Sequence, residues 1–307
     1  MGTPEFAVPC LEALTAWPGA EMAGVFTQPD RPKGRGNRLT ASPVKQAAEA
    51  AGIPVFQPEK IRRDGADTLR GLKPDLCVTA AFGQILSREI LEIPPMGNIN
   101  VHASLLPKHR GSAPIAHAIM AGDPKAGVTT MMMDEGIDTG DMLLKAETEI
   151  GLSETCGELT ERLSETGAEL LIRTVKELEA GTLKRTPQNE AEMTYDPMMN
   201  KGMSIPDFTA DADSVRGLIN GLNPWPCVSV PLGNDRLKLL RAAKAEGSGE
   251  AGAVITADPK GGLVIACGSG AVRILEIQAP GGKRMKPEDY LRGHEIPVGT
   301  DLKEDRA

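Results

Sequence analysis

The segment Asp75-Leu76-Cys77-Val78-Thr79-Ala80-Ala81-Phe82 is a continuous, largely apolar run of strand length. Runs of this kind are typical of strands that are buried on both faces of a parallel sheet. Further strands are predicted before and after it along the chain, at residues 21–27, 97–103, 128–133 and 142–150. The first two-thirds of the chain is therefore expected to contain a buried sheet.

Helices are predicted before, between and after these strands. Thr3 is in a position to cap a helix over residues 4–14, and residues 43–51 suit a second helix. Two capping boxes, beginning at Thr155 and Thr166, predict two more. Alternating strands and helices imply the α/β class with a Rossmann-like parallel-core sheet, in which ligands bind at the carboxyl ends of the strands.

A break in this pattern divides the chain. Residues 187–206 are polar, interrupted by proline and glycine, and predict a linker between a first domain at 1–186 and a second at 207–307. In the second domain, short strands separated by turn signals predict a small β-barrel. The candidate strands are residues 227–232, 237–243, 253–257, 263–267 and 272–279.

Composition limits the class of protein. The 307 residues carry 42 acidic and 34 basic side chains, and the net charge of −8 argues against a general nucleic-acid binder. The five cysteines are scattered, as expected of buried thiols in a reducing compartment. No segment is long and apolar enough to span a bilayer and no signal peptide is visible, so we expect a cytoplasmic monomer without membrane contact.

A polar strand face gives the strongest indication of chemistry. In Asn98-Ile99-Asn100-Val101-His102, the alternation of a strand puts two amides and an imidazole on one face. Asn is depleted in strands, so two of them beside a histidine favour a functional role. A half-exposed strand with a solvated polar face is the open alternative.

An acidic loop follows the next strand. Residues 134–141, Asp-Glu-Gly-Ile-Asp-Thr-Gly-Asp, hold four carboxylates. An amide, an imidazole and a carboxylate are the usual parts of an acyl-transfer site, where donors stabilise a tetrahedral oxyanion and a carboxylate orients the imidazole. A solvated turn or a calcium loop is the alternative, although the DxDxDG spacing of a calcium loop is absent.

A basic, glycine-rich loop lies near the start of the chain. Arg31, Lys33, Arg35 and Arg38 fall within eight residues and are interleaved with Gly34 and Gly36. Such a loop is suited to wrapping phosphates. An ordinary surface loop is the alternative.

The residues around the polar strand resemble a known family. Asn100-x-His102, followed by residues 104–107 (Ser-Leu-Leu-Pro) and by Asp138, is similar to the signature of the formyltransferases that use 10-formyltetrahydrofolate. The basic loop and the segment at 223–226 (Asn-Pro-Trp-Pro) resemble the members of this family that act on transfer RNA. The resemblance covers nearly the whole chain, including residues 2–6, 26–32, 42–45 and 54–58.

The resemblance implies a reaction and its partners. The reaction is transfer of a formyl group from 10-formyltetrahydrofolate to the α-amino group of methionyl initiator tRNA, for translation initiation. Asn100 and His102 would donate to the oxyanion and Asp138 would hold the imidazole, with no metal. The second domain would be an OB-like barrel that binds tRNA, so the partners are a reduced folate and the initiator tRNA.

The resemblance also implies contact residues for each partner. The folate contacts fall on Ser104, Leu105, Leu106 and Pro107, and on Phe82, Gly83, Ile85 and Leu86. For the set at residues 82–86, plain hydrophobic core is the alternative. The tRNA contacts fall on Arg31, Lys33, Arg35 and Arg38.

One departure concerns the first strand of the sheet. The chain opens on Met1-Gly2-Thr3-Pro4, whereas a strand–loop–helix unit needs a strand before the glycine, and the family has a central strand there. We therefore expect the sheet to lack its first strand in this sequence. The hypothesis is that Met1 is the last residue of that strand and that the start codon is misassigned.

Other functions share these residues. Transfer of formyl to an amino sugar or a nucleotide-precursor amine, or hydrolysis of the folate donor, would also use Asn100, His102 and Asp138. An inactive RNA-binding or assembly protein on the same scaffold is an alternative of a different class. A zinc site built from His102, His109 and His117 is disfavoured, because the spacing of these residues is unlike that of known zinc motifs.

Overall fold

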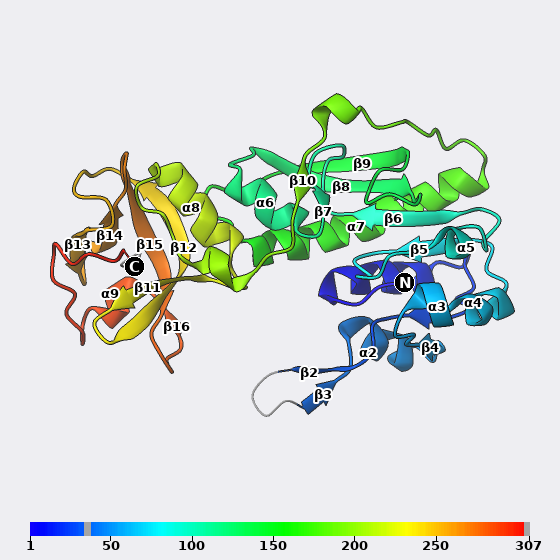
Figure 1. The fold of residues 1–307 in the computed structure, drawn as a ribbon, viewed down its shortest axis with the longest axis horizontal. Helices are drawn as coiled ribbons and strands as arrows, with labels where there is room; N and C mark the ends of the chain where they lie inside the picture. Colours follow the sequence, from blue (N-terminus) through cyan, green and yellow to red (C-terminus); the bar gives the residue numbers. More distant parts are fainter. Residues whose placement is uncertain (34–37, 304–307) are drawn as a thin grey trace. The chain divides into compact units, whose positions relative to one another are not determined.

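The computed structural model describes residues 1–33 and 38–303, and the chain forms two compact units (Figure 1). The first unit comprises Met1–Gly111, Gly127–Thr148 and Thr160–Tyr195. The second comprises Ser112–Ala126, Glu149–Leu159 and Asp196–Ala307. Two short segments that precede residue 186, Ser112–Ala126 and Glu149–Leu159, thus belong to the second unit. The linker assigned to residues 187–206 stays a prediction.

Six strands form two of the sheets in the first unit. They are β1 (Val25–Phe26), β4 (Val55–Phe56), β5 (Cys77–Thr79), β6 (Asn98–His102), β8 (Lys125–Met132) and β9 (Met142–Glu149). One sheet has the order β5-β6-β8-β9, and β1 pairs with β4 in parallel. The prediction of an α/β fold with parallel strands is confirmed.

Strand β8 departs from the predicted topology. It runs antiparallel to β6, with His102 opposite Thr129, whereas β5 and β6 are parallel. The expected parallel crossover is absent because α6 (Pro114–Met120), the helix between β6 and β8, packs against α8 (Ala212–Gly221) of the second unit. A parallel pair needs a crossover that returns the chain to the same end of the sheet.

The first two residues of the chain lie between β1 and β5. The Met1 nitrogen donates to the Val78 carbonyl at 2.7 Å, and the Gly2 nitrogen donates to the Phe26 carbonyl at 3.0 Å. Gly2 also forms a parallel bridge with Ala80. A cavity of about 510 Å³ adjoins Met1 and is lined by residues of α1, β1 and β5. A further strand between β1 and β5 stays a prediction.

Short helices surround these strands. They are η1 (Glu5–Ala7), α1 (Val8–Ala16), α2 (Pro43–Ala50), α3 (Ile61–Asp64), α4 (Ala66–Leu72) and α5 (Arg88–Leu91). Ser42 caps α2 by accepting from the Lys45 N–H at 3.2 Å. The prediction that Thr3 caps the first helix is wrong, because its hydroxyl donates to the Phe82 carbonyl at 2.9 Å and so ties two loops together.

A single helix replaces two predicted ones. Helix α7 (Cys156–Glu179) begins at the first capping box, where the Thr155 N–H donates to Glu158 at 3.0 Å. The second capping box lies inside the helix, and the Thr166 hydroxyl donates to the Arg162 carbonyl. The adjoining Gly167 lets the helix approach the sheet, since a Cβ there would lie 3.0 Å from Val101. A capping sequence therefore begins a helix only where the preceding turn is not already helical.

The basic segment of the first unit forms a hairpin. Strands β2 (Arg31–Lys33) and β3 (Arg38–Thr40) pair antiparallel, and Figure 1 shows this hairpin extending from the rest of the unit. Arg31 donates to the Gln28 side chain at 3.3 Å. Arg35 lies outside the described residues, so its predicted contact with tRNA stays a prediction.

The second unit contains a curled antiparallel sheet. Its strands, in the order β11-β12-β15-β14-β13 with β16 beside β15, are β11 (Val228–Leu232), β12 (Asp235–Ala245), β13 (Val254–Asp258), β14 (Gly262–Ala266), β15 (Ala271–Gln278) and β16 (Arg284–Met285). The five predicted strands are confirmed to within about two residues. Closure into an OB-like barrel is not confirmed.

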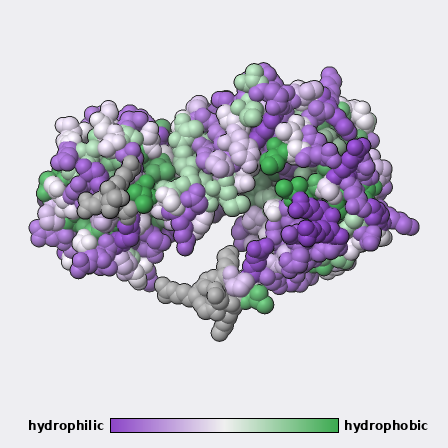
Figure 2. Space-filling model, in the orientation of Figure 1, coloured by the Kyte–Doolittle hydropathy of each residue, from purple (hydrophilic) through white to green (hydrophobic). Residues whose placement is uncertain are grey.

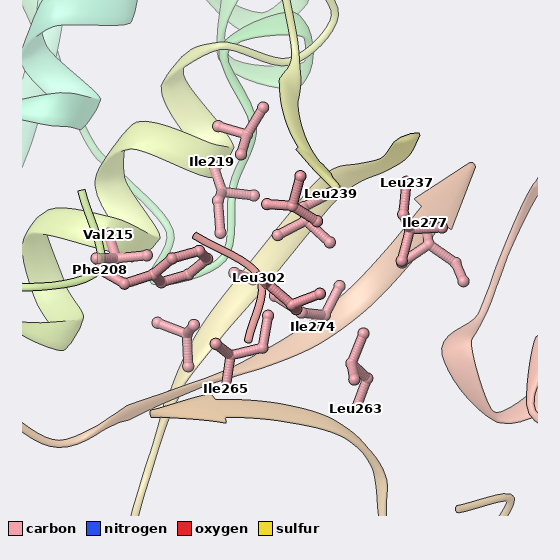
Figure 3. Close-up of a cluster of buried hydrophobic side chains, with 14 of the residues drawn as sticks. Phe208, Val215, Ile219, Leu237, Leu239, Leu263, Ile265, Ile274, Ile277 and Leu302 are labelled. Atoms are coloured by element: carbon pink, nitrogen blue, oxygen red, sulfur yellow. The ribbon is translucent and has the colours of Figure 1, made fainter. Parts of the chain in front are cut away.

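The core of the second unit lies between α8 and this sheet. Figure 3 shows Val215 and Ile219 of α8 directed toward Leu239, Ile265 and Ile274 of the strands, and all five are buried. Each fully buried aliphatic side chain of this kind contributes about 1.5–3 kcal/mol of stability.

The remaining short elements belong to both units. They are η2 (Glu190–Glu192), η3 (Lys201–Ser204), α9 (Pro287–Tyr290), β7 (Arg110–Gly111) and β10 (Tyr195–Asp196).

The visible surface is mostly hydrophilic, with small and separate hydrophobic patches (Figure 2). Leu39, Leu152 and Trp225 are among the exposed large hydrophobic side chains. Within residues 1–33 and 38–303, no helix has the length and apolar character needed to cross a membrane.

Candidate active site

Three side chains predicted from the sequence lie together in the first unit. The Asn100 amide donates to the Asp138 carboxylate at 3.3 Å, and Nδ1 of His102 lies 3.5 Å from the same oxygen. Asn100 and His102 are buried, and the Asp138 side chain is only 15% exposed. Strand alternation puts Asn100 and His102 on the face that Asp138 reaches, as the sequence indicated.

Asp138 reaches His102 by a route that strand order alone did not predict. Because β8 is antiparallel to β6, it ends beside Ile99, at the opposite end of β6 from His102. Residues 133–141 then turn back along β8, and the Met132 N–H donates to the Asp141 carbonyl at 2.9 Å. The expectation that the site residues gather at shared carboxyl ends of parallel strands is therefore wrong, although the residues do meet.

Two contacts hold Asp138 in an uncommon backbone conformation. Its φ is 54°, in the left-handed region that non-glycine residues rarely adopt. The Gly111 N–H donates to Oδ2 of Asp138 at 2.9 Å, which leaves Oδ1 for Asn100 and His102. The Gln188 amide donates to the carbonyls of Asp138 and Gly140 at 2.7 and 2.8 Å.

The hydrogen bonds of His102 define its tautomer. Nε2 lies 2.8 Å from the His109 carbonyl, which can only accept, so Nε2 carries a proton. His109 is itself held by the Thr194 hydroxyl, which accepts from its N–H at 2.7 Å. Nδ1 is left facing Asp138 at a distance too long for a strong hydrogen bond. Nδ1 is therefore the ring nitrogen that can exchange a proton with a ligand.

The first predicted folate segment is a rigid turn beside His102. The Ser104 hydroxyl donates to the Lys108 carbonyl at 2.7 Å, and the Thr129 hydroxyl bridges the Ser104 carbonyl and the Leu106 N–H. The Leu106–Pro107 bond is cis, and the Lys145 ammonium donates to the Leu106 carbonyl. Partial burial lowers the pKa of Lys145.

The second predicted folate segment is divided between core and surface. Phe82 and Leu86 are buried in a hydrophobic cluster with Ile61 and Ile90, whereas Ile85 is 63% exposed. The Gly83 carbonyl accepts from the Gln28 amide at 2.7 Å. Of this segment, Ile85 and the backbone near Gly83 are the parts accessible to a ligand, and their role stays a prediction.

Several residues support the site, and three of them were not predicted. Gln188, Thr129 and Thr194 hold the backbone around it, and Arg110 forms a two-pronged ion pair with Glu190 at 2.7 and 3.1 Å. The bond from Arg110 lowers the pKa of Glu190. Only Arg110 lies in a recognisable motif, so the other three carried no local signal. In the described part of the chain, no cluster of three or more His, Cys, Asp or Glu side chains is arranged to hold a metal.

Models of two protein families match the chain. Residues 1–175 match the formyl transferase model, and residues 198–295 match the model of the formyl transferase C-terminal domain. A chain whose α/β unit brings an amide, an imidazole and a carboxylate together, and which also has an antiparallel β unit, is thus of the class of proteins that transfer formyl groups. The chain belongs to the formyl transferase family.

Curated relatives narrow the comparison. A protein of Geotalea daltonii named methionyl-tRNA formyltransferase is 48% identical over 303 residues, covering 98% of this chain and 96% of the relative. A methionyl-tRNA formyltransferase of Citrifermentans bemidjiense is 46% identical over 300 residues, covering 97% and 94%. As a member of this family, the chain is an enzyme that transfers a formyl group.

Solved structures share the fold. A sugar 3N-formyl transferase named WlaRD, crystallised with dTDP and 5-N-formyl-THF, has a TM-score of 0.66 at 17% identity and covers 91% of this chain and 94% of its own. An N-formyltransferase from Helicobacter canadensis, in complex with folinic acid and dTDP-3-aminofucose, gives 0.66 at 16%, covering 92% and 97%. At these identities the similarity concerns the fold alone.

Proposed function

We propose that the chain transfers the formyl group of 10-formyltetrahydrofolate to the α-amino group of methionyl initiator tRNA. The observation that carries this proposal is the identity of 46–48%, over nearly the whole chain, to relatives named for that reaction, in a chain that brings Asn100, His102 and Asp138 together.

The side chains suit a direct attack of the amine on the formyl carbon. As the new C–N bond forms, the formyl oxygen becomes an oxyanion. The Asn100 amide carries two hydrogens, of which Asp138 takes one, so the second is available to the oxyanion. The resemblance implied that His102 would also donate to the oxyanion, but its Nε2–H is held by the His109 carbonyl, so in this proposal its Nδ1 instead accepts a proton from the attacking amine. Collapse of the intermediate breaks the bond to N10 of the folate, which takes up the proton that the amine gave to His102.

Asp138 orients the His102 ring and supplies the negative charge that faces it. Its Oδ1 faces both Asn100 and Nδ1 of His102, so a proton on Nδ1 would face a carboxylate across 3.5 Å. A carboxylate in this position stabilises the imidazolium that forms when the amine loses its proton. No step requires a metal or a covalent enzyme intermediate.

The substrates are assigned to different parts of the chain. The folate binds beside the turn at Ser104, Leu105, Leu106 and Pro107 and the exposed side of residues 82–86. The tRNA contacts the β2–β3 hairpin, through Arg31, Lys33, Arg35 and Arg38, and the antiparallel unit, which is the OB-like tRNA-binding domain of this proposal. The enzyme acts as a monomer in the cytoplasm.

A formylation assay tests the proposal directly. The full chain is incubated with 10-formyltetrahydrofolate and charged initiator tRNA, and formylmethionyl-tRNA is quantified. Uncharged tRNA, which lacks the acceptor amine, serves as the blank, and a nucleotide-linked amino sugar serves as the alternative acceptor. Formylation of the methionyl-tRNA alone is the expected result, whereas turnover only with the amino sugar would move the chain to another branch of the family. Folate binding without any turnover would favour the binding-protein alternative.

A further inference from the structure

The side-chain amide of Gln188 makes three hydrogen bonds beside the site, two as a donor and one as an acceptor. Its two amide hydrogens go to the carbonyls of Asp138 and Gly140, at 2.7 and 2.8 Å. Its carbonyl oxygen accepts from Nε of Arg110 at 3.0 Å. Only this orientation of the amide satisfies all three partners, because two of them accept and one donates. Gln188 is half-buried and lies 50 residues from Asp138 in the sequence.

The segment that carries Gln188 is fixed from both sides. Before it, Thr186 exchanges two backbone hydrogen bonds of 2.9 Å with Met142 at the start of β9. After it, Glu190 holds the Arg110 guanidinium, whose side chain is only 3% exposed. The Gln188 amide is thus presented to the acidic loop by a rigid support.

The loop needs such a support at this point. Asp138 has a φ of 54°, a conformation that favours glycine, so the loop does not adopt it without compensating contacts. The two bonds from Gln188 fall on the carbonyls of Asp138 itself and of a residue two positions on. They fix the direction in which the Asp138 side chain leaves the backbone, and hence its 3.5 Å approach to His102.

We propose that Gln188 is a positioning residue for formyl transfer, which acts through the backbone of Asp138 and touches neither substrate. This inference rests on the proposed function, because it assigns Asp138 a part in the reaction. Arg110 holds the Gln188 carbonyl, and Glu190 in turn holds the Arg110 guanidinium. An acid at position 188 would put a carboxylate against two carbonyls and disrupt this arrangement.

The kinetic test compares Gln188→Ala and Gln188→Glu with Asn189→Asp. Asn189 is the neighbouring amide, and its Nδ2 contacts Glu192, away from the acidic loop. Both Gln188 variants should lower kcat by about 10–100-fold, with KM for both substrates within about threefold, as expected of groups that orient a site residue. Asn189→Asp should match the parent. A parental kcat in Gln188→Ala would overturn the proposal.

A double variant separates positioning from general structural support. If Gln188 acts through Asp138, then adding Gln188→Ala to Asp138→Ala should change kcat by less than about threefold, because groups that act as a unit are not additive. A further loss equal to that of the single Gln188 variant would show that Gln188 acts elsewhere.

Hydrogen exchange supplies a readout that does not depend on the reaction. Amides of residues 134–141 and the Gly111 N–H, which donates to Asp138, should exchange faster in Gln188→Ala and remain protected in Asn189→Asp. Unchanged protection in Gln188→Ala would refute the positioning claim even if the enzyme is active. If the parent chain does not formylate tRNA but Gln188→Ala still loses protection, then the proposed function is rejected and the positioning role of Gln188 stands.

Discussion

The Asp138 carboxylate lies 3.5 Å from Nδ1 of His102, although residue 138 follows the end of β8 that is farthest from His102. The proximity is produced by the return of residues 133–141 along β8, not by the order of the strands. The polar face of β6 is a property of its own sequence, whereas its acidic partner depends on the shape of a loop. Perturbing the loop should therefore affect catalysis more than stability.

Replacing Asp138 by Asn should remove most activity with little effect on folding. The amide would put a donor where the Asn100 amide needs an acceptor, and it would remove the carboxylate that faces Nδ1 of His102, so the imidazolium formed during transfer would lose its counter-charge. A fall in kcat of about 10²–10⁴-fold is expected, as for other groups in proton transfer. Steady-state kinetics and thermal unfolding measure the two effects.

Asp134→Asn is the matched control for that substitution. Asp134 lies in the same loop and accepts from the Gly136 N–H and the Thr139 hydroxyl, contacts that an amide oxygen preserves. Asp134→Asn removes the same charge as Asp138→Asn. It should leave kcat within about threefold of the parent value, in line with surface substitutions that keep their contacts. Equal losses in both variants would mean that the loop's charge, not the position of Asp138, matters.

Asn100 and Asn98 share a strand face and should respond differently to alanine. Asn100→Ala removes the proposed oxyanion donor and should lower kcat by about 10²–10³-fold. The Asn98 amide donates to the Leu91 carbonyl at 2.8 Å, so Asn98→Ala should instead lower stability by about 1–3 kcal/mol. Urea unfolding and initial rates on both variants distinguish the roles. A large kcat loss in Asn98→Ala with unchanged stability would contradict this division.

The sequence predicts the elements of this fold better than their connections. The strands of the second unit were located closely because turns with glycine at positive φ, such as Gly233, Gly262 and Gly270, bound them. The single helix α7 and the direction of β8 were missed. The first depends on Gly167 packing against β6, and the second on α6 packing against α8. Both are tertiary contacts that local patterns do not encode.

The residues of the site that could be predicted from the sequence are those on a single strand and those in the family motif. Alternation alone put Asn100 and His102 on a common face, and the family resemblance supplied Asp138. The supports Thr194 and Gln188 lie 85 and 50 residues from their partners His109 and Asp138. Nothing near them in the sequence marks them, because a single hydrogen bond to a distant carbonyl or N–H requires only one ordinary polar residue.

The β2–β3 hairpin should affect tRNA use and not folate use. Lys33→Ala/Arg38→Ala removes two charges from it and should raise KM for methionyl-tRNA. It should also make the tRNA binding constant less dependent on salt. The slope of the logarithm of this constant against the logarithm of the salt concentration should fall by about 0.7–0.9 for each phosphate that the hairpin no longer neutralises. Arg62→Ala/Arg63→Ala removes two charges from exposed positions of α3 and serves as the control. The hairpin assignment fails if KM for the folate rises in place of that for tRNA.

Protonation of the Glu158 carboxylate in acid should destabilise the start of α7. Burial alone would raise the pKa of this carboxyl, but bonds from the Thr155 N–H and hydroxyl and from Arg241 outweigh it, so the pKa lies below its ordinary value. A lowered pKa means that the stabilisation is complete above the unfolded value of about 4.3 and disappears as pH falls through the folded one.

Denaturant unfolding between pH 3 and 7 tests this dependence. Glu158→Gln should flatten the acid limb, whereas Glu161→Gln, at an exposed position one turn along the helix, should retain it. At pH 7, Thr155→Ala should cost about 0.5–2 kcal/mol, as does loss of an N-cap elsewhere. An unaltered acid limb in Glu158→Gln would assign the effect to other carboxylates.

Gly140 should be indispensable to the returning loop for a steric reason. A Cβ at this position would lie 1.8 Å from the Met132 carbonyl oxygen, so alanine forces the loop away from β8 and carries Asp138 with it. Gly140→Ala should therefore lower kcat at least as far as Asp138→Asn does, and overpacking of this kind costs about 1–3 kcal/mol of stability.

Gly71→Ala provides the opposite case in the same unit. Nothing lies within 4 Å of a Cβ at this position of α4, so alanine should stabilise the protein by about 0.5–1 kcal/mol and leave kcat unchanged. Thermal unfolding and kinetics of the two variants separate a backbone that needs glycine from one that tolerates it. If Gly140→Ala were as active as Gly71→Ala, Asp138 could not owe its place beside His102 to the packing of this loop against β8.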